Sequence, residues 1–401
     1  MSKLHALKGK IQHYAWGGKT FIPNLLGMAP NDEKCAEYWL GAHDNAPSTI
    51  DTLSGAKPLN AYLKSNLIEV LGEDVAKSFG RLPFLFKVLD VHDMLSIQVH
   101  PTKVEAEKGF KKENELGIPI TAPHRNYKDD NHKPEIMVAL SEFWLLHGFL
   151  SKEKLTKRLQ DVPELNHLEP IFSAGGYLGL YKKVMEQTAE ECNATLQPLI
   201  DRILPLYTSG KLEKSSPDYW AAKAVAMAND KDNLDKGIYS IYFFNIVKAN
   251  KGEAVFQDAG IPHAYLEGQN MELMANSDNV LRGGLTPKHV DVPELLKHVA
   301  FEETIPNVMD GTLQEDGIER IYKTPAPDFE LSKLELTKPN TYHNVANSAQ
   351  IVIVIDGEAE VSEADKTITL TKGEAVFIEA NCSYTINAVE ATATIYKATA
   401  P

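Results

Sequence analysis

The sequence predicts a mainly β protein interrupted by an α-helical insertion, and three observations support this expectation. The tail from about residue 325 alternates apolar and polar positions, as in FELSKLEL and KTITLTKGEAVFIEA, a pattern typical of strands with one buried face. The stretch 151–236 is rich in Leu, Ala, Glu, Lys and Gln, which favour helices. Apolar, aromatic-rich strand material stands on both sides of that stretch, at 82–100 and 237–256.

The chain length agrees with several folding units. At 401 residues the chain exceeds what one hydrophobic core usually covers. Because the β segments on either side of the helical stretch have the same texture, we expect them to form one domain. The expected division is 1–150 and 237–324 as two parts of one β domain, 151–236 as a helical domain inserted in it, and 325–401 as a C-terminal β domain.

Two local patterns add detail to the expected elements. In the tail, AQIVIVIDGEAEV contains Asp356-Gly357, a dipeptide typical of a two-residue hairpin, so a turn is expected there. In the helical stretch, apolar residues spaced three and four apart mark one buried helix face: Leu196, Leu199, Ile200, Ile203 and Leu204.

One strand-and-turn unit is repeated. The hexapeptide KGEAVF occurs at 251–256 and again at 372–377, an offset of 372 − 251 = 121 residues. At this offset His263 aligns with Tyr384. We therefore expect the same turn and short strand in both copies, with a histidine available in only the first.

The composition excludes several classes of partner. The formal net charge of −14 would repel the phosphates of nucleic acids and anionic membrane surfaces. The longest aliphatic run, IVIVI at 351–355, is too short to span a bilayer, and residues 1–20 lack an apolar signal-peptide core. Three widely separated cysteines make neither a disulfide framework nor a CxxC motif. We expect a cytoplasmic protein in a reducing environment, with no nucleic-acid or membrane partner.

Possible metal ligands stand on predicted strands of the first β segment. In LSIQVHP, Gln98 and His100 are two positions apart, so both side chains project from the same face of a strand. Glu135 follows Pro134 and opens the apolar strand IMVAL, where a buried carboxylate would need a cation. For Gln98 and His100, a satisfied polar pair in a sheet or turn is the alternative.

The first copy of the repeat adds a histidine to this set. The run from Gly252-Glu253 to Gly260-Ile-Pro-His263 resembles the second motif of the cupins, with Asp258 where that pattern usually has proline. In such small jelly-roll barrels, strand alternation points the histidine inward to a metal. Two imidazoles, a carboxylate and an amide oxygen suit Zn²⁺, while Mn²⁺, Fe²⁺, Co²⁺ and Ni²⁺ are not excluded by ligand type. The predicted ligands are Gln98, His100, Glu135 and His263.

Longer segments resemble one family. YKDDNHKPE (127–135) and HAYLEGQNMELMANSDNVLRGGLTPK (263–288) are similar to the two signature segments of the type I phosphomannose isomerases. YAWGG (14–18) and AEYWLGAHDNAP (36–47) are similar to the family's N-terminal segments. The resemblance runs through nearly the whole chain in order, with Gly283 as a departure where the family pattern has alanine.

This resemblance implies an isomerase that interconverts mannose 6-phosphate and fructose 6-phosphate through a metal-stabilised enediol, with one Zn²⁺ on the four predicted ligands. It also implies a catalytic cupin split by the helical insertion, so that the fold contains two cupin-type jelly-roll barrels and a helical domain. Because Tyr384 replaces the histidine in the second copy, we expect the C-terminal barrel to be free of metal. The expected partner is a hexose 6-phosphate; a monomer is compatible with the sequence, which leaves the oligomeric state open.

The reaction requires proton transfer between C1 and C2 and stabilisation of negative oxygen. Arg282 matches the position that the family uses in catalysis, with an ion pair to Asp278 or Glu272 as the structural alternative. Glu272 and Lys133 are the candidates for proton transfer, Lys133 because burial near a metal favours the neutral amine. Hydrogen bonds to sugar hydroxyls are the alternative role for both.

The resemblance also predicts where the substrate binds. It implies that Ser96, Lys87 and Lys288 lie at or near the phosphate end of the pocket, where lysines act as point charges and a hydroxyl donates a hydrogen bond. Tyr265 comes two residues after His263, shares its strand face, and is expected to line the sugar site. A packed core tyrosine is the alternative.

Two other functions compete with the isomerase. A cupin-type oxygenase would use similar ligands but needs iron with open positions for O₂ and a substrate. A sugar-phosphate-binding regulator would keep the fold and lose turnover. The long match at 263–288 and the presence of all four ligands together with Arg282 favour the isomerase.

Overall fold

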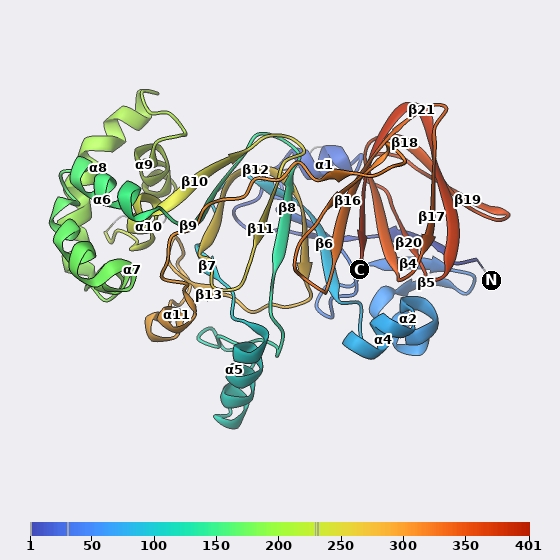
Figure 1. The fold of residues 1–401 in the computed structure, drawn as a ribbon, viewed down its shortest axis with the longest axis horizontal. Helices are drawn as coiled ribbons and strands as arrows, with labels where there is room; N and C mark the ends of the chain where they lie inside the picture. Colours follow the sequence, from blue (N-terminus) through green and yellow to red (C-terminus); the bar gives the residue numbers. More distant parts are fainter. Residues whose placement is uncertain (1, 30–31, 229, 231) are drawn as a thin grey trace.

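A computed structural model describes residues 2–29, 32–228, 230 and 232–401. Its strands form two large antiparallel sheets, and the two longest helices gather at one end of the molecule. In Figure 1 the helices α6 to α10 lie at that end, the first sheet lies in the middle, and the second sheet, mostly orange and red with its N-terminal strands in blue, lies at the other end. None of the described helices is long and apolar enough to cross a membrane.

The first sheet combines strands from both sides of the helical stretch, as the sequence predicts. Its main path runs β10-β9-β12-β6-β3-β2, and β8 and β7 pair with β12 while β11 pairs with β8 and β13 with β7. The strands are β2 (Lys10–Gln12), β3 (Glu37–Leu40), β6 (Phe84–Val91), β7 (Gln98–Val99), β8 (Glu135–Ala139), β9 (Phe143–Phe149), β10 (Phe244–Ala249), β11 (Ala254–Gln257), β12 (His263–Ala275) and β13 (Leu281–Arg282).

The second sheet contains the tail and also three strands from the N-terminal part of the chain. Its path is β14-β15-β16-β21-β18-β20-β1-β4-β5, with β17 on β21 and β19 on β18. The division expected at residue 325 did not anticipate this pairing. The strands are β1 (Leu4–Lys8), β4 (Thr49–Thr52), β5 (Gly55–Pro58), β14 (Thr312–Leu313), β15 (Glu319–Tyr322), β16 (Glu330–Thr337), β17 (Thr341–Ala346), β18 (Gln350–Glu363), β19 (Lys366–Leu370), β20 (Ala375–Ile378) and β21 (Cys382–Thr399).

The helical stretch is confirmed, but it continues further than predicted. GIYSIYF, expected to be a strand, forms helix α10, and the strand begins only at Phe244. Every residue of α10 is buried, so the segment shows no amphipathic period, and a short fully apolar run cannot be assigned to helix or strand from periodicity. The helices of this part are α6 (Lys152–Asp161), α7 (Glu169–Met185), α8 (Ala189–Thr208), α9 (Pro217–Met227) and α10 (Gly237–Phe243).

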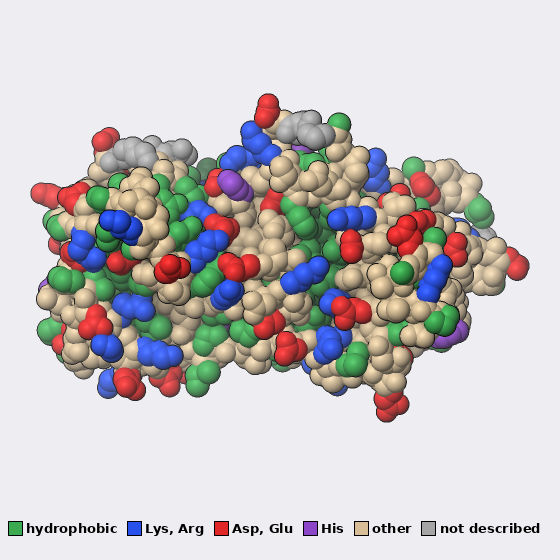
Figure 2. Space-filling view, turned by 90° about the horizontal axis from the view of Figure 1, so that it is seen from above, with side chains coloured by type: hydrophobic (Ala, Val, Ile, Leu, Met, Phe, Trp, Pro, Cys, Tyr) green, Lys and Arg blue, Asp and Glu red, His purple; other side chains and the backbone are tan. Residues whose placement is uncertain are grey.

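The remaining helices flank the sheets. In Figure 1, α2 and α4 lie beside the second sheet and α5 projects from the first. They are α1 (Phe21–Leu25), α2 (Leu59–Ser65), α3 (Leu67–Leu71), α4 (Glu73–Phe79), α5 (Lys103–Glu115) and α11 (Val292–His298). Acidic and basic side chains are interspersed over the face drawn in Figure 2.

The hairpin predicted at Asp356-Gly357 is wrong. Strand β18 continues through this dipeptide, and its pairing with β21 shifts register on both sides of it. Gly357 has φ +77°, and a β-carbon there would lie 2.4 Å from the Thr392 carbonyl oxygen. The glycine is therefore needed for a β-bulge and for the close approach of two backbone segments. An Asp-Gly dipeptide is compatible with such a bulge as well as with a hairpin turn.

The repeat is confirmed as a structural unit. Strand β11 begins at Ala254 and β20 at Ala375, which differ by 375 − 254 = 121, the sequence offset. Each is preceded by a turn whose glycine, Gly252 or Gly373, has positive φ (92° and 85°). The residues after the two strands differ, and that difference concerns the site.

Candidate metal centre

The strand register brings the predicted ligands into one row. In the first sheet Gln98 pairs with His263 on one side and with Arg282 on the other. Residues directly opposite one another on paired strands project from the same face. Gln98 is therefore flanked by a ligand histidine and by the predicted catalytic arginine.

His100, Glu135 and His263 meet at the same place. Their ligand atoms all lie within 4.8 Å of one another, and the three residues are 0%, 3% and 3% exposed. Nε2 of His100 lies 3.5 Å from Oε1 of Glu135, and Nε2 of His263 lies 3.4 Å from Oε2. The predicted trio thus comes from the residue directly after β7, from β8 and from β12, although these residues are up to 163 positions apart (263 − 100).

Backbone carbonyls fix the tautomer of both imidazoles. Nδ1 of His100 lies 2.9 Å from the Asn279 oxygen, and Nδ1 of His263 lies 2.9 Å from the Ile261 oxygen. Because a carbonyl only accepts, each Nδ1 carries a proton, and Nε2 is the nitrogen that bears the lone pair in the neutral imidazole. Within the part of the chain that the structure describes, both Nε2 atoms are buried without a hydrogen-bond partner.

The charges of His100 and Glu135 place unshared electron pairs of the imidazole and the carboxylate opposite one another. Burial lowers the pKa of His100 to about 4. Burial alone would raise the pKa of Glu135, but Lys133, 2.8 Å away, and the His100 imidazole hold it well below its usual range. At neutral pH an ionised carboxylate therefore faces the lone pair of His100 inside the protein, an arrangement that a divalent cation of zinc type would satisfy.

A second charged group adjoins the trio. Nζ of Lys87 lies 2.8 Å from Glu272 and 3.4 Å from Glu37, and 5.3 Å from the centroid of the Trp39 ring. Burial would lower the pKa of Lys87, but the two carboxylates raise it. Burial, with the charges of Glu135 and Glu37, raises the pKa of Glu272 despite Lys87. Sequence reasoning missed Glu37 and Trp39 as site residues, although both stand in the AEYWLGAH segment.

Both groups share one enclosed cavity of about 50 Å³. Tyr265 lines it, as predicted from its strand face, and burial raises the pKa of its hydroxyl. Of the predicted residues, Ser96, His100, Arg282 and Lys288 are outside the described lining, although His100 contacts Glu135. The cavity is lined by Glu37, Lys87, Leu89, Leu95, Gln98, Lys133, Glu135, His263, Ala264, Tyr265 and Glu272.

Two lysines lie near Arg282, the cross-strand neighbour of Gln98. Burial lowers the pKa of Arg282; burial and the charge of Arg282 lower the pKa of Lys288. Lys128, which was not predicted, has a pKa lowered by burial, by Arg125 and by Arg282. The structural alternative for Arg282 fails within the described chain, because Asp278 pairs with His43 at 3.2 Å and Glu272 with Lys87.

The second copy of the repeat has a different interior. Tyr384 donates a hydrogen bond to Oε1 of Gln350 at 2.5 Å and accepts one from Asn344 at 3.1 Å. Nearby, Lys397 forms an ion pair with Glu319 at 2.7 Å. Hydrogen-bonded polar side chains thus occupy the place that corresponds to His263.

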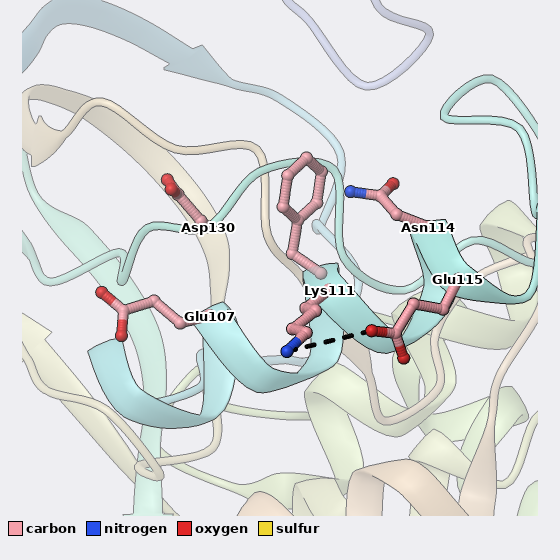
Figure 3. A pocket seen from close by; sticks show the side chains of 6 residues that line it. Glu107, Lys111, Asn114, Glu115 and Asp130 are labelled. Carbon is pink, nitrogen blue, oxygen red and sulfur yellow. Dashed lines mark ion pairs between the residues drawn. The ribbon is translucent and has the colours of Figure 1, made fainter.

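A larger hollow of about 510 Å³ runs along the projecting helix α5. Figure 3 shows that its side chains spread along the helix and its neighbouring loop and do not converge on one point. Its ion pair, Lys111 with Glu115 at 3.9 Å, links successive turns of the same helix. These are properties of a solvated helix face, so the smaller cavity, which adjoins the two imidazoles and the carboxylate, is the better candidate for the functional site.

A mainly β fold with a buried centre of two imidazoles and a carboxylate defines a cupin-type, metal-binding protein. Comparison with known proteins narrows this class. The model for the catalytic domain of type I phosphomannose isomerases matches residues 4–152, and the model for the mannose-6-phosphate isomerase cupin domain matches residues 319–395. The chain is 38% identical to the mannose-6-phosphate isomerase of Escherichia coli strain K12, over 94% of this chain and 95% of that one. It is 32% identical to the human enzyme, over 97% and 96%.

Solved structures agree. A mutant phosphomannose isomerase from Salmonella typhimurium superposes with a TM-score of 0.90 at 34% identity, with 100% of both chains covered. The enzyme from the same organism bound to fructose 6-phosphate and zinc gives 0.87, at the same identity and coverage. The chain belongs to the type I phosphomannose isomerase family.

Proposed function

We propose that this protein interconverts mannose 6-phosphate and fructose 6-phosphate, with one Zn²⁺ held by Gln98, His100, Glu135 and His263. The observation that carries the metal site is the convergence of two buried Nε2 atoms, without hydrogen-bond partners among the described residues, on a buried, ionised carboxylate. Gln98 completes the set through its pairing with His263. When bound, zinc supplies a Lewis acid that polarises a sugar oxygen and stabilises negative charge on it.

Glu272 is our candidate for the proton transfer between C2 and C1. The pKa of Glu272 is raised toward neutral pH, and a general acid–base group works best when its pKa is near the working pH. It lines the same cavity as Glu135, so a sugar carbon near the metal ligands would be within its reach. Lys133, also in the lining, is placed to donate a hydrogen bond to a sugar oxygen.

We propose a different role for Lys87 from the one expected. The family resemblance implies that Lys87 lies at the phosphate end, but its charge is already neutralised by the carboxylates of Glu37 and Glu272. This pairing supports a role in holding Glu272. The phosphate would instead lie toward Arg282 and Lys288, with Ser96 beside Gln98 on the neighbouring segment. A cavity of about 50 Å³ is too small for a whole hexose phosphate, which is consistent with an outward-facing phosphate.

The same proposal covers the architecture. We propose that each sheet closes into a cupin-type jelly roll and that 151–243 is the inserted helical domain. The catalytic jelly roll is formed by 1–150 and 244–311 without β1, β4 and β5, which belong to the second sheet together with β14 and β15. The matching repeat units and the cupin-domain match at 319–395 support two related barrels. Three free buried cysteines support the reducing cytoplasm as the location.

A coupled assay for fructose 6-phosphate formation tests the function. Chelator-treated protein is assayed before and after addition of Zn²⁺, beside the variant His263→Gln. The matched control is His147→Gln, because His147 is a buried neighbour in the same strand row whose ring hydrogen-bonds Gln257 at 2.7 Å. Zinc-restored turnover and one bound zinc in wild type and control, both lost in His263→Gln, are expected.

Two outcomes would overturn the proposal. Bound zinc without turnover of either sugar phosphate would favour a binding protein. Oxygen consumption with iron, and no isomerisation, would favour the oxygenase.

A further inference from the structure

The loop after Arg282 is held by a carboxylate from the helical part of the chain. Oδ1 of Asp235 accepts hydrogen bonds from the backbone N–H groups of Gly237 and Leu285, both at 2.7 Å. Its Oδ2 accepts from the N–H of Thr286 at 2.9 Å. One side chain between α9 and α10 thus binds two successive amides of the segment that leads from Arg282 to Lys288.

The other side of this loop is attached to the ligand strand. The N–H of Gly283 donates to the Ile97 oxygen at 2.8 Å, and the N–H of Ile97 donates to the Gly284 oxygen at 3.0 Å. The next pair in the ladder is Arg282 with Gln98. The loop therefore lies between Asp235 and the strand that carries Gln98, and a shift of the loop would shift the arginine.

The contact with the helical part is tight. A β-carbon on Gly284 would lie 2.5 Å from the Gly237 nitrogen, and one on Gly237 would lie 2.5 Å from the Leu285 nitrogen. Leu285 has φ +55°, a left-handed conformation that is unfavourable for a branched side chain. The hydrogen bond from its own N–H to Asp235 opposes relaxation out of that conformation.

The segment that carries Asp235 is itself anchored. The N–H of Leu234 donates to Oδ1 of Asn193 on α8 at 2.8 Å. Nζ of Lys236 donates to the Met185 oxygen at the end of α7 at 2.7 Å. Asp235 therefore transmits the position of two long helices to the loop.

We infer that Asp235 is a positioning residue for substrate phosphate: it fixes the loop that sets Arg282 and Lys288 against the metal-ligand strand. The helical insertion then has a part in the reaction although none of its residues lines the described cavity. This inference rests on the proposed function, because it takes Arg282 and Lys288 as the groups that meet the substrate.

The variant Asp235→Asn tests it with little change of shape. The amide keeps one acceptor, but its NH₂ group faces one of the backbone N–H donors. Displacing a positioned group by about 1 Å costs on the order of 100-fold in rate, so kcat/KM for mannose 6-phosphate should fall by up to about that factor. The KM and the inhibition constant of inorganic phosphate should both rise. Zinc content and far-UV circular dichroism should match the wild type.

A matched control and a double-mutant cycle separate positioning from general destabilisation. Asp316→Asn is the control, because Oδ1 of Asp316 accepts from the amides of Ile318 and Glu319 at 2.9 and 3.0 Å in a turn of the second sheet. It should leave kinetics unchanged. In a Lys288→Ala background, Asp235→Asn should weaken phosphate binding by a smaller factor than in the wild type, because one of the two groups that it positions is absent.

Unchanged phosphate inhibition in a folded, zinc-loaded Asp235→Asn protein would overturn the inference, and so would a full additive effect in the Lys288→Ala background. If Asn at this site prevents folding, Asp235→Ser is measured in the same way. Binding of inorganic phosphate by titration calorimetry does not depend on turnover. If the wild type does not isomerise mannose 6-phosphate, the proposed function is wrong. If the Asp235 variant binds phosphate normally, only the inference about Asp235 is wrong.

Discussion

Replacing Lys87 with methionine should destabilise the protein strongly at neutral pH. At an effective dielectric constant of about 20, unit charges 2.8 and 3.4 Å apart interact by roughly 6 and 5 kcal/mol. Desolvation of the three groups offsets much of this attraction. Removal of one partner from a buried ion pair therefore costs a net of about 3–5 kcal/mol.

The cost should depend on pH. The variant leaves Glu37 and Glu272 buried without their cation, and the pKa of Glu272, already raised in the wild type by burial, should rise further. A carboxyl whose folded pKa exceeds its unfolded value of about 4.3 destabilises increasingly as the pH rises from that value to the folded pKa. The loss in free energy of unfolding should be at least about 1 kcal/mol smaller at pH 5 than at pH 8.

Urea unfolding of chelator-treated wild type and variant at both pH values measures this. Lys157→Met is the control: Lys157 forms an ion pair with Asp161 at the same 2.8 Å, but both side chains are exposed. It should cost no more than about 1 kcal/mol at either pH. An equal loss for Lys87→Met and Lys157→Met, or a greater loss at pH 5 than at pH 8, would refute the electrostatic reasoning.

Three further outcomes are expected. Arg282→Lys should raise the KM for mannose 6-phosphate and lower kcat/KM by about 10-fold or more while zinc stays bound, because a point charge cannot replace a planar guanidinium at the phosphate oxygens; an unchanged KM would count against this role. Gly357→Val should lower the unfolding midpoint in urea, because its β-carbon meets the Thr392 oxygen, whereas Gly175→Ala, whose β-carbon would meet no atom within 4 Å, should change stability by no more than about 0.5 kcal/mol. Metal-free protein should lose stability as the pH falls from 6.5 to about 4, because in this range His100 takes up a proton in the unfolded chain but not in the folded protein. His100→Gln should reduce this loss of stability by up to about 3 kcal/mol. An unchanged loss in the variant would contradict the assignment of the pH dependence to His100.

The sequence predicted the metal trio because its residues carry local signatures. Alternation put Gln98 and His100 on one face, and Pro134 set Glu135 at the start of a strand. The position of Glu37 could not be obtained in this way, because it reaches Lys87 only through the pairing of β3 with β6. Such a pairing is a property of the tertiary fold and leaves no local pattern.

Gly283 and Asp235 illustrate the same limit. A β-carbon on Gly283 would lie 2.8 Å from the Tyr181 hydroxyl and from Cγ2 of Ile97, so the departure from the family's alanine is explained by a tyrosine more than a hundred residues earlier in the chain. In the sequence DNLDKG, nothing distinguishes Asp235 from other charged loop residues. Its importance arises only when helix and strand segments meet.

The pairing of β1 with β20 has a consequence for how the chain is made. Leu7 leaves the ribosome long before its partner Ala375, a separation of 375 − 7 = 368 residues. At roughly 5–20 residues per second, that interval lasts about 20–70 s. During this interval, the edge of β1 that will pair with β20 has unpaired backbone N–H and C=O groups, which can mispair with other polypeptides. Heterologous expression should therefore benefit from slower synthesis or from a holdase chaperone, and a tag that obstructs β1 should lower the yield of folded enzyme more than a tag at the other terminus.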